Sequence, residues 1–525
     1  MKKEFSNLIS LLKSKKSNIK SFEEIAKTNP NHIWIEPTSR CNTRCKHCGH
    51  YYHDFGEDMS EDIYQKIKNS ILNNVKRIDL FGYGEPFIAK NFYQMFDECS
   101  KRNIAICITT NGICLRDDTL VSKLVRNNVH LVLSFEGAKP ETYEFIRPYI
   151  KWEKMIETLE CIKRNANSAG AEKRFKLSFN FLLIKKNIND LTDIVQLAAR
   201  YGAEEVTASP LGGIDSFEEI KNQSIYDSLE LIQPLLIKSL KIANKLGVKL
   251  FIAPVLSDFI LNDNENGKSL KSKMIRLFRK AQLGIIYIKM KGIKPTLNKL
   301  FYGFEPKPKI GLRYCYLPWE DCFVSAKGNV FPCCIMGDPL GNLNNQEWND
   351  IWNGSLYKNL RRTIHSWNPT AVCRYCPYPL GILGGDEKYY EKFFSKYKKE
   401  EIPLNSPDIN YGEGFYDLEH KEDGSPSHRW MKQKAKLILP MKENAKFIRF
   451  SIIPHFPPST INPGRCTINN TVTEPFDNTC LKITFPIDFI KGKRIELKFE
   501  MENKYKVDPD PRELALAISG IQYLS

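Results

Sequence analysis

Apolar and polar residues follow two alternating periods along the first half of the chain. Short β-rich runs such as "HIWIEPTS", "RIDLFGYG" and "NIAICITTN" are each followed by a segment, for example "SEDIYQKIKNSILNN", whose apolar residues recur at helical spacing. The pattern continues through "HLVLSFEG", "KLSFNFLLI" and "EVTASPL", and "GVKLFIAPV" is a possible further strand. Six strands that alternate with helices predict a parallel sheet, barrel-like or doubly wound, with ligands at the carboxyl ends of the strands.

The pattern changes near residue 411. Runs such as "AKLILP", "KFIRFSIIP" and "RIELKFEM" alternate apolar and polar residues, and Pro, Asn and Gly lie between them. This spacing predicts half-buried antiparallel strands and a β-sandwich of about a hundred residues.

At 525 residues the chain is too long for one ordinary domain. The patterns predict an α/β protein whose segments are 1–30, an N-terminal helical extension; 31–255, the strand–helix domain; 256–310, a basic helical insertion; 311–385, a small cysteine-rich α+β unit; 386–410, a linker; and 411–525, the all-β sandwich.

The formal net charge of +16 comes largely from lysines scattered over helical faces, which we interpret as solvated surface. No nucleic-acid partner is expected, although lysines near a cleft could attract phosphate. The basic insertion could lie on an anionic membrane surface or cover the substrate site, but packing on the sheet domain is the simpler interpretation. The N-terminus resembles no signal peptide, and no run of 18 apolar residues predicts a membrane span.

Fifteen cysteines, an odd number, are concentrated at 41–48, 315–334 and 373–376. This grouping indicates metal binding by reduced thiols, and therefore a cytoplasmic location, rather than a secreted disulfide framework. The isolated cysteines are expected to be buried small apolar residues: Cys99, Cys107, Cys114, Cys161, Cys466 and Cys480.

The first group, "TSRCNTRCKHCGHYYH", has the spacing C-x3-C-x2-C on the loop after the first strand. Three thiolates are one too few for a tetrahedral zinc site, which His47, His50 or His53 could in principle complete. A [4Fe–4S] cluster with three protein thiolates instead leaves one iron open for an exogenous ligand.

This loop resembles that of the radical SAM superfamily. His47 stands where the family usually has an aromatic residue. The resemblance implies that Cys41, Cys45 and Cys48 hold a [4Fe–4S] cluster whose open iron binds S-adenosylmethionine (SAM). The family cleaves SAM with one electron, from a reductant such as flavodoxin or ferredoxin, to a 5′-deoxyadenosyl radical that abstracts hydrogen. It also implies a partial (β/α)6 barrel.

Three further motifs resemble the family in register on successive strands: "FGYGEP", "TTNG" and "SFEGAKPETYEFIRP". The resemblance implies that Gly84 lets the backbone approach the cofactor and that Glu85 lies near its amino group. It places Ser134 near the ribose and Arg147 near the carboxylate. Glu136 stands where the family usually has aspartate.

The second group, "CYLPWEDCFVSAKGNVFPCC" with the later "CRYC", resembles the SPASM/twitch extension of radical SAM enzymes. The resemblance implies an auxiliary [4Fe–4S] cluster on Cys315, Cys333, Cys373 and Cys376, in the single-cluster twitch form. Cys322 and Cys334 are interpreted as packing or neighbouring residues, although either could replace a ligand. A structural zinc on the same four thiolates is the alternative.

The substrate is less defined, and the sequence identifies no catalytic base. "HRWMKQKAKLILP" and "DPDPRELALAISGIQYL", with Trp430 and Arg512, resemble a sandwich appended to enzymes of surface-polysaccharide gene clusters. This resemblance implies a radical SAM oxidoreductase, such as a dehydrogenase, that acts on a small sugar or nucleotide-sugar. The alternatives are a peptide-modifying SPASM maturase and a non-catalytic metal-cluster scaffold.

Overall fold

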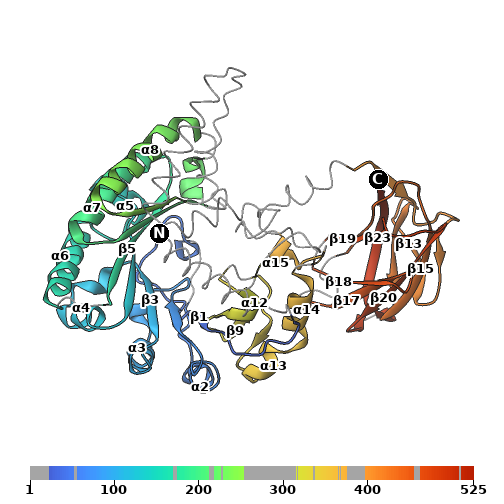
Figure 1. Ribbon diagram of the computed structural model, residues 1–525, viewed down its shortest axis with the longest axis horizontal. Coiled ribbons are helices and arrows are strands. Elements are labelled where there is room, and N and C mark those ends of the chain that lie inside the picture. Colours follow the sequence, from blue (N-terminus) through green and yellow to red (C-terminus); the bar gives the residue numbers. More distant parts are fainter. Residues whose placement is uncertain are drawn as a thin grey trace, which may run out of the picture. The chain divides into compact units, whose positions relative to one another are not determined.

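The computed structural model describes two compact units (Figure 1). The sheet unit comprises Pro30–Glu305 and Phe323–Asn329; the sandwich unit comprises Met1–Asn29, Pro306–Cys322 and Val330–Ser525. Within them the structure describes residues 23–51, 56–169, 174–211, 218–225, 229–252, 315, 317–334, 337–364, 366, 368–374, 397–453, 461–479, 481–507 and 510–525.

Parallel strands in chain order form the sheet of the sheet unit. They are β1 (His32–Ile35), β2 (Arg77–Leu80), β3 (Ala105–Thr110), β4 (Val129–Ser134), β5 (Lys176–Leu183), β6 (Glu205–Pro210) and β7 (Lys249–Ile252). The pairing is parallel from His32 opposite Arg77 through to Ala208 opposite Ile252. The six predicted strands and the possible seventh are therefore confirmed.

Helices connect these strands. They are α2 (Glu61–Ser70), α3 (Phe92–Lys101), α4 (Asp118–Val125), α5 (Pro140–Ile146), α6 (Trp152–Ser168), α7 (Leu191–Tyr201) and α8 (Leu229–Leu246). Helices α3, α4, α6, α7 and α8 lie along the outer side of the curved sheet (Figure 1).

Helix α7 shows why these segments are helical. Its buried residues Leu191, Ile194, Val195 and Ala198 recur at helical spacing, and it ends at Gly202, whose φ of 76° suits a residue without Cβ.

The parallel sheet stays open. Among the described residues β7 is its last strand, so the strands do not close into a full barrel, in agreement with the predicted partial barrel. At the other edge β1 accepts β8 (Asp321–Val324), with Glu36 N donating to Val324 O at 2.9 Å. The hairpin residues Phe323–Asn329 thus belong to the sheet unit although they lie far along the chain.

The cysteine-rich part of the sandwich unit is built from short elements. They are α12 (Leu317–Glu320), β9 (Asn329–Phe331), β10 (Gly341–Asn342), α13 (Trp348–Trp352), α14 (Ser355–Thr363) and α15 (Ala371–Arg374). The stacked rings of Trp348 and Trp352 lie at its core, with centroids 5.2 Å apart.

Residues 23–29 pack against these elements without forming a helix. Trp352 Nε1 donates to Thr28 O at 2.9 Å, and the side chain of Asn353 bonds both the N–H and the carbonyl of Ala26. Because side chains satisfy this backbone, the segment needs no helix of its own. The predicted N-terminal helical extension is therefore not seen in its described part, and residues 1–22 lie outside the described residues.

Antiparallel strands form the predicted β-sandwich. One sheet has the order β13-β14-β23-β16-β19 with β11 also paired to β23, and the other has the order β12-β15-β20-β17-β18. The strands are β11 (Lys399–Ile402), β12 (Asn410–Tyr411), β13 (Phe415–His420), β14 (Pro426–Met431), β15 (Lys434–Pro440), β16 (Phe447–Ile452), β17 (Pro463–Ile468), β18 (Val472–Asp477), β19 (Lys482–Pro486), β20 (Arg494–Met501) and β23 (Leu516–Leu524), besides the ribbon β21 (Tyr505–Val507) and β22 (Asp510–Leu514).

The sandwich core explains the alternation. Phe450, Phe476, Phe485 and Phe499 point inward from both sheets, with ring centroids 5.5 to 6.2 Å apart. The sandwich begins earlier than predicted, because β11 falls inside the segment assigned to a linker. The rest of that linker up to residue 396, and the basic insertion at 256–310, lie outside the described residues.

Two further predictions can be compared directly. Among the described residues no helix is long and apolar enough to cross a membrane. The isolated cysteines Cys99, Cys107, Cys161 and Cys466 are buried, as predicted, while Cys114 is half-buried and Cys480 lies outside the described residues.

Candidate metal and cofactor site

In the loop after β1, two of the three cysteines lie against one hydroxyl. Thr43 Oγ1 lies 3.4 Å from Cys41 Sγ and 3.4 Å from Cys45 Sγ. The N–H of Cys48 donates to the carbonyl of Cys45 at 3.0 Å, which closes a turn. Cys45 is buried, whereas Cys41 and Cys48 are half-buried, so two of the three cysteines are partly exposed to solvent.

The donor set fits an iron–sulfur cluster. Thiolates are the ligands of such clusters, which take one protein thiolate per iron and therefore tolerate wider spacing than a single metal ion. No group of three or more His, Cys, Asp or Glu side chains in the described ranges is arranged to hold one metal ion. A compact zinc quartet with His47 or His50 is thus absent there, and His53 lies outside these ranges.

Burial controls the ionisation of the thiols. Burial raises the pKa of Cys45 and of Cys48, and the positive charge of Arg147 opposes this in both cases. A buried thiol becomes a good metal ligand only when a metal or a cation stabilises its anion. The loop is therefore suited to thiolates that a cluster and a nearby guanidinium stabilise together.

The turn after β2 passes very close to this loop at Gly84. A Cβ on Gly84 would lie 2.1 Å from Thr38 O and 2.5 Å from Arg40 O, which no side chain can occupy. The next residue, Glu85, donates its N–H to Arg40 O at 2.9 Å. Glycine is therefore required where the "GYGEP" turn contacts the residues immediately before Cys41.

Glu85 ties this turn to the end of β3. Its carboxylate accepts hydrogen bonds from Thr110 Oγ1 at 2.7 Å, Asn111 N at 2.8 Å and Phe87 N at 3.4 Å. Burial raises the pKa of Glu85 to about 7, although these donors favour the charged form. Asn111 continues the network, since its Nδ2 lies 2.7 Å from Asn42 Oδ1 and 3.9 Å from Cys41 Sγ.

Glu36 was not among the sequence-predicted site residues. Its buried carboxylate accepts Tyr83 N at 2.8 Å and Ala326 N at 3.0 Å, so it joins the "GYGEP" turn to the β8–β9 hairpin. A Cβ on Gly82 would lie 2.4 Å from the Glu36 side chain. The only signal in the sequence is an acidic residue directly after the buried run "HIWI", which by itself does not identify a partner.

Glu136 and Arg147 form a buried ion pair beside the cysteine loop. Arg147 Nη2 donates to Glu136 Oε1 at 2.8 Å, Nε donates to the other carboxylate oxygen, and Nη1 donates to Cys45 Sγ at 3.3 Å. Burial would raise the pKa of Glu136, but the Arg147 guanidinium holds it below its ordinary value. Glu136 thus contacts Arg147, while Ser134 is half-buried at the end of β4.

His47 lies close to this pair as a neutral ring. Burial lowers its pKa to about 4. Its Nδ1 is buried and has no hydrogen-bond partner among the described residues, and the same holds for the hydroxyl of Tyr143. Two polar atoms without partners beside the cysteine loop are unusual, because buried polar groups are nearly always hydrogen-bonded.

Three of the four predicted auxiliary ligands are among the described residues. Cys315 is buried and Cys333 and Cys373 are half-buried in the sandwich unit, while Cys376 lies outside the described residues. Cys322 is completely buried in β8, where burial raises its pKa well above the ordinary value, in keeping with a packing role. The assignment of ligands remains a prediction.

The residues that suggested a sugar-related sandwich have structural contacts. Trp430 is buried with Leu514 and Ala517. Arg512 Nη2 donates to Asp510 Oδ2 at 2.6 Å and to Glu419 Oε1 at 2.7 Å.

Comparison with known families identifies both cysteine regions. Residues 35–198 match the model of the radical SAM superfamily, and residues 315–377 match that of the SPASM iron–sulfur cluster-binding domain.

Several characterised proteins are similar to the chain. The tungsten-containing aldehyde ferredoxin oxidoreductase cofactor-modifying protein of Pyrococcus furiosus is 26% identical over 45% of this chain and 66% of its own length. The AdoMet-dependent heme synthase of Methanosarcina barkeri is 23% identical over 67% and 90%. A mycofactocin maturase of Mycolicibacterium smegmatis is 23% identical over 32% and 41%.

Among solved structures, SuiB of Streptococcus suis bound to S-adenosylmethionine aligns with 64% of this chain and 69% of its own, at 15% identity and a TM-score of 0.43. The two domain matches imply a SAM-binding [4Fe–4S] cluster, auxiliary iron–sulfur binding and SAM itself as cofactors. They cover the loop of Cys41, Cys45 and Cys48 and the segment that holds the later cysteines. The chain therefore carries a domain that matches the radical SAM superfamily and, after it, a domain that matches the SPASM iron–sulfur family.

Proposed function

We infer that this chain is a maturase, which cleaves SAM reductively at the first cysteine loop and modifies a peptide or protein substrate. The observation that carries the chemistry is the arrangement of Cys41 and Cys45 around Thr43, with Cys48 bonded to the Cys45 carbonyl, beside the Gly84 turn. When bound, the cluster and SAM supply a 5′-deoxyadenosyl radical that removes a hydrogen atom from the substrate.

The side chains of the sheet unit prepare this site. Gly84 allows the turn to contact the loop, and Glu85 aligns that turn with the end of β3. One lone pair of the Glu85 carboxylate remains beyond its three donors, which is compatible with the predicted contact to the amino group of SAM. Ser134, at the end of β4, is the proposed ribose contact.

The relatives favour a maturase over a sugar oxidoreductase. The chain is similar to a protein named as a maturase and to one named as a cofactor-modifying protein, and neither name mentions a sugar. The sugar hypothesis rested on the sandwich, whose Trp430 and Arg512 contact residues of the sandwich itself. The sugar hypothesis is therefore kept only as the alternative outcome of the experiment described below.

The second cluster would sit in the SPASM region on Cys315, Cys333, Cys373 and Cys376. A ferredoxin or flavodoxin is the proposed electron donor for the first cluster. We propose that the auxiliary cluster binds the substrate or accepts an electron from the substrate radical, which would give the overall reaction its oxidative character.

The experiment is an anaerobic assay of the reconstituted full chain with dithionite and SAM. Formation of 5′-deoxyadenosine that disappears in Cys41→Ala supports the radical SAM assignment, and its absence would refute it. Peptides encoded beside the gene and a panel of nucleotide-sugars are then added separately. A mass change in a peptide, together with faster 5′-deoxyadenosine formation, supports the maturase; the same response to a sugar alone would overturn it.

A further inference from the structure

Arg147 is buried between a carboxylate and a cysteine of the first loop. Its side chain is only 6% exposed. Nε and Nη2 hold both carboxylate oxygens of Glu136, and Nη1 points to Cys45 Sγ at 3.3 Å. A guanidinium presents its donors in a fixed planar fork, so two bonds to Glu136 fix the direction of the third.

The backbone holds the same geometry from both sides. Arg147 directly follows α5, and its N–H donates to Tyr143 O at 2.9 Å. Lys46, next to Cys45, donates its N–H to Ile146 O at 3.1 Å. The residue before Arg147 is therefore bonded to the residue after Cys45, and the contact between guanidinium and sulfur lies on a rigid frame.

We propose that Arg147, oriented by Glu136, donates a hydrogen bond to the Cys45 sulfur and thereby raises the reduction potential of the first cluster. This inference rests on the proposed cluster at Cys41, Cys45 and Cys48, but not on the substrate class. Hydrogen bonds to cluster sulfurs and nearby charge set the reduction potential, because they stabilise the more negative, reduced form.

The charge of Glu136 provides a second test, in which the reduction potential should shift in the opposite direction. Its negative charge compensates the positive charge of Arg147 within the buried pair. Removing only the negative charge leaves an uncompensated cation near Cys45, which favours the reduced cluster. Removing both charges leaves neither the cation nor the hydrogen bond, which favours the oxidised cluster. A residue that only supports the loop would not shift the potential in two directions.

The test compares two variants in the reconstituted full chain. They are Glu136→Gln and the double variant Glu136→Gln/Arg147→Met, which leaves no unpaired charge in the buried site. A potentiometric titration followed by electron paramagnetic resonance uses the signal that changes when SAM is added, which identifies the first cluster. Iron content shows whether the cluster is retained.

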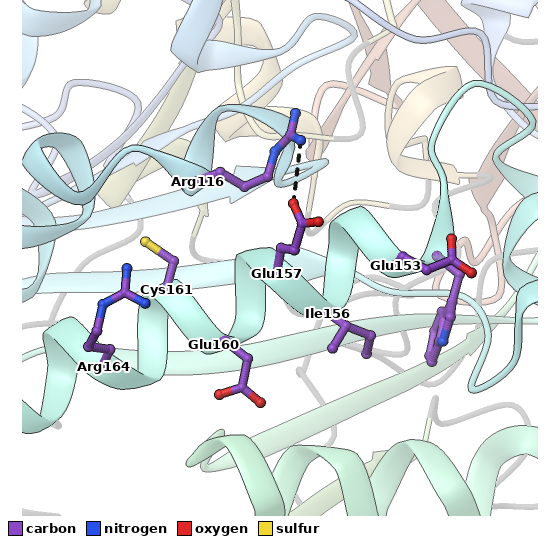
Figure 2. A pocket seen from close by; sticks show the side chains of 8 residues that line it. Arg116, Glu153, Ile156, Glu157, Glu160, Cys161 and Arg164 are labelled. Carbon is purple, nitrogen blue, oxygen red and sulfur yellow. Dashed lines mark ion pairs between the residues drawn. The ribbon is translucent and has the colours of Figure 1, made fainter.

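A matched control pair lies on the surface of the same unit. Arg164, on α6, donates to Asp118 Oδ1 at 2.6 Å, and both side chains are 60% exposed. Arg164 lines a shallow surface groove of about 530 Å³ together with Cys161 and Glu160 (Figure 2). Solvent screens such exposed charges, so Asp118→Asn/Arg164→Met should leave the potential unchanged.

The double variant is expected to lower the ratio of reduced to oxidised cluster about tenfold at a fixed potential, a shift of about 59 mV for one electron. Glu136→Gln is expected to shift the potential upward. Unchanged potentials in both variants, with iron retained, would overturn the proposal. If the double variant loses iron, Glu136→Gln alone tests the proposal: an upward shift in its potential supports the proposal, and an unchanged potential overturns it. A weaker affinity for SAM without any shift would instead assign Arg147 to the SAM carboxylate and also refute the proposal.

Discussion

Substitution of Gly84 by alanine should weaken SAM binding through a movement of the cysteine loop. The new Cβ would lie 2.1 Å from Thr38 O and 2.5 Å from Arg40 O. Real contacts of this kind are about 3.0 Å or longer, so the Thr38 carbonyl must move by about 0.9 Å. The segment cannot move freely, because Thr38 Oγ1 and Ser39 Oγ both donate to Glu57 O.

The cost of this displacement can be bounded. Overpacking of a tight contact costs about 1 to 3 kcal/mol, and the Glu85 N to Arg40 O bond of 2.9 Å is stretched at the same time. If that strain is expressed in the cofactor site, SAM affinity falls about 5- to 150-fold, since 1.4 kcal/mol is tenfold. Arg40 directly precedes Cys41, so the movement reaches this proposed cluster ligand.

Isothermal titration of the reconstituted protein with SAM measures the effect. Gly56→Ala is the matched control, because a Cβ there has no heavy atom within 4 Å. A Gly84→Ala protein with full iron content and a Kd within about twofold of the Gly56→Ala value would show that the turn does not shape the cofactor site.

Three other changes test the packing around the site and in the sandwich. Glu36→Ala leaves the N–H groups of Tyr83 and Ala326 without acceptors, so urea unfolding should show a loss of at least about 2 kcal/mol; Lys327→Ala, which removes an exposed ion pair on the same hairpin, should stay within about 0.5 kcal/mol. Burial raises the pKa of Glu474 from 4.5 to about 7. Below pH 4.5 this carboxyl is neutral and its burial carries no charge penalty, and the folded state loses stability as the pH rises from 4.5 through 7. Glu474→Gln, which stays neutral, should therefore stabilise β17 and β18 by about 3 kcal/mol at pH 8.5 and by about 1 kcal/mol at pH 5. Amide hydrogen exchange of these strands, compared with that of the native protein, measures the gain in stability. An equal gain at both pH values would contradict this prediction. Asn368→Ala should reduce iron from about eight toward about four atoms per chain, while Thr467→Ala, on the exposed face of the sandwich, should not.

The elements of the fold could be predicted because their signals are local. The period of two or of 3.6 in the apolar residues identified β1 to β7, most of the helices between them and several of the sandwich strands, among them β15, β16 and β20. β11 was missed because "KEEI" carries charged residues on an exposed edge, and its partner β23 is more than a hundred residues away. Likewise, residues 23–29 have helical composition but form no helix, because their backbone is bonded by Trp and Asn side chains from α13 and the residue after it.

The candidate ligands of the site could be proposed from the sequence, and their assignment stays a prediction, whereas the hydrogen bonds that connect the site residues could not be predicted. The spacing of Cys41, Cys45 and Cys48 is a local signal, and so is the glycine of the turn. The bond from Glu36 to Ala326 joins positions 290 residues apart, and no periodicity reports such a pair. The departure at Glu136 becomes interpretable only in three dimensions, where the longer carboxylate side chain holds two nitrogens of Arg147.

One asparagine bonds the cysteine-rich part of the sandwich unit to the β-sandwich. Asn368 lies between α14 and α15, and its amide donates to Thr484 O at 2.9 Å while its carbonyl accepts Thr484 N at 2.7 Å. A side chain thus makes the pair of bonds that a neighbouring strand would make with β19. Ala371 N also donates to Thr479 Oγ1 at 2.8 Å, two residues before Cys373.

Small cysteine-rich segments bury little apolar surface and depend on such supports until a metal cluster is bound. The sandwich therefore fixes the backbone that presents Cys373, independently of any ligand that its outer surface binds. This role predicts that loss of the Asn368 bonds lowers auxiliary iron while the first cluster and its SAM affinity remain. A sandwich that serves only to recruit a partner would leave both clusters intact in Asn368→Ala.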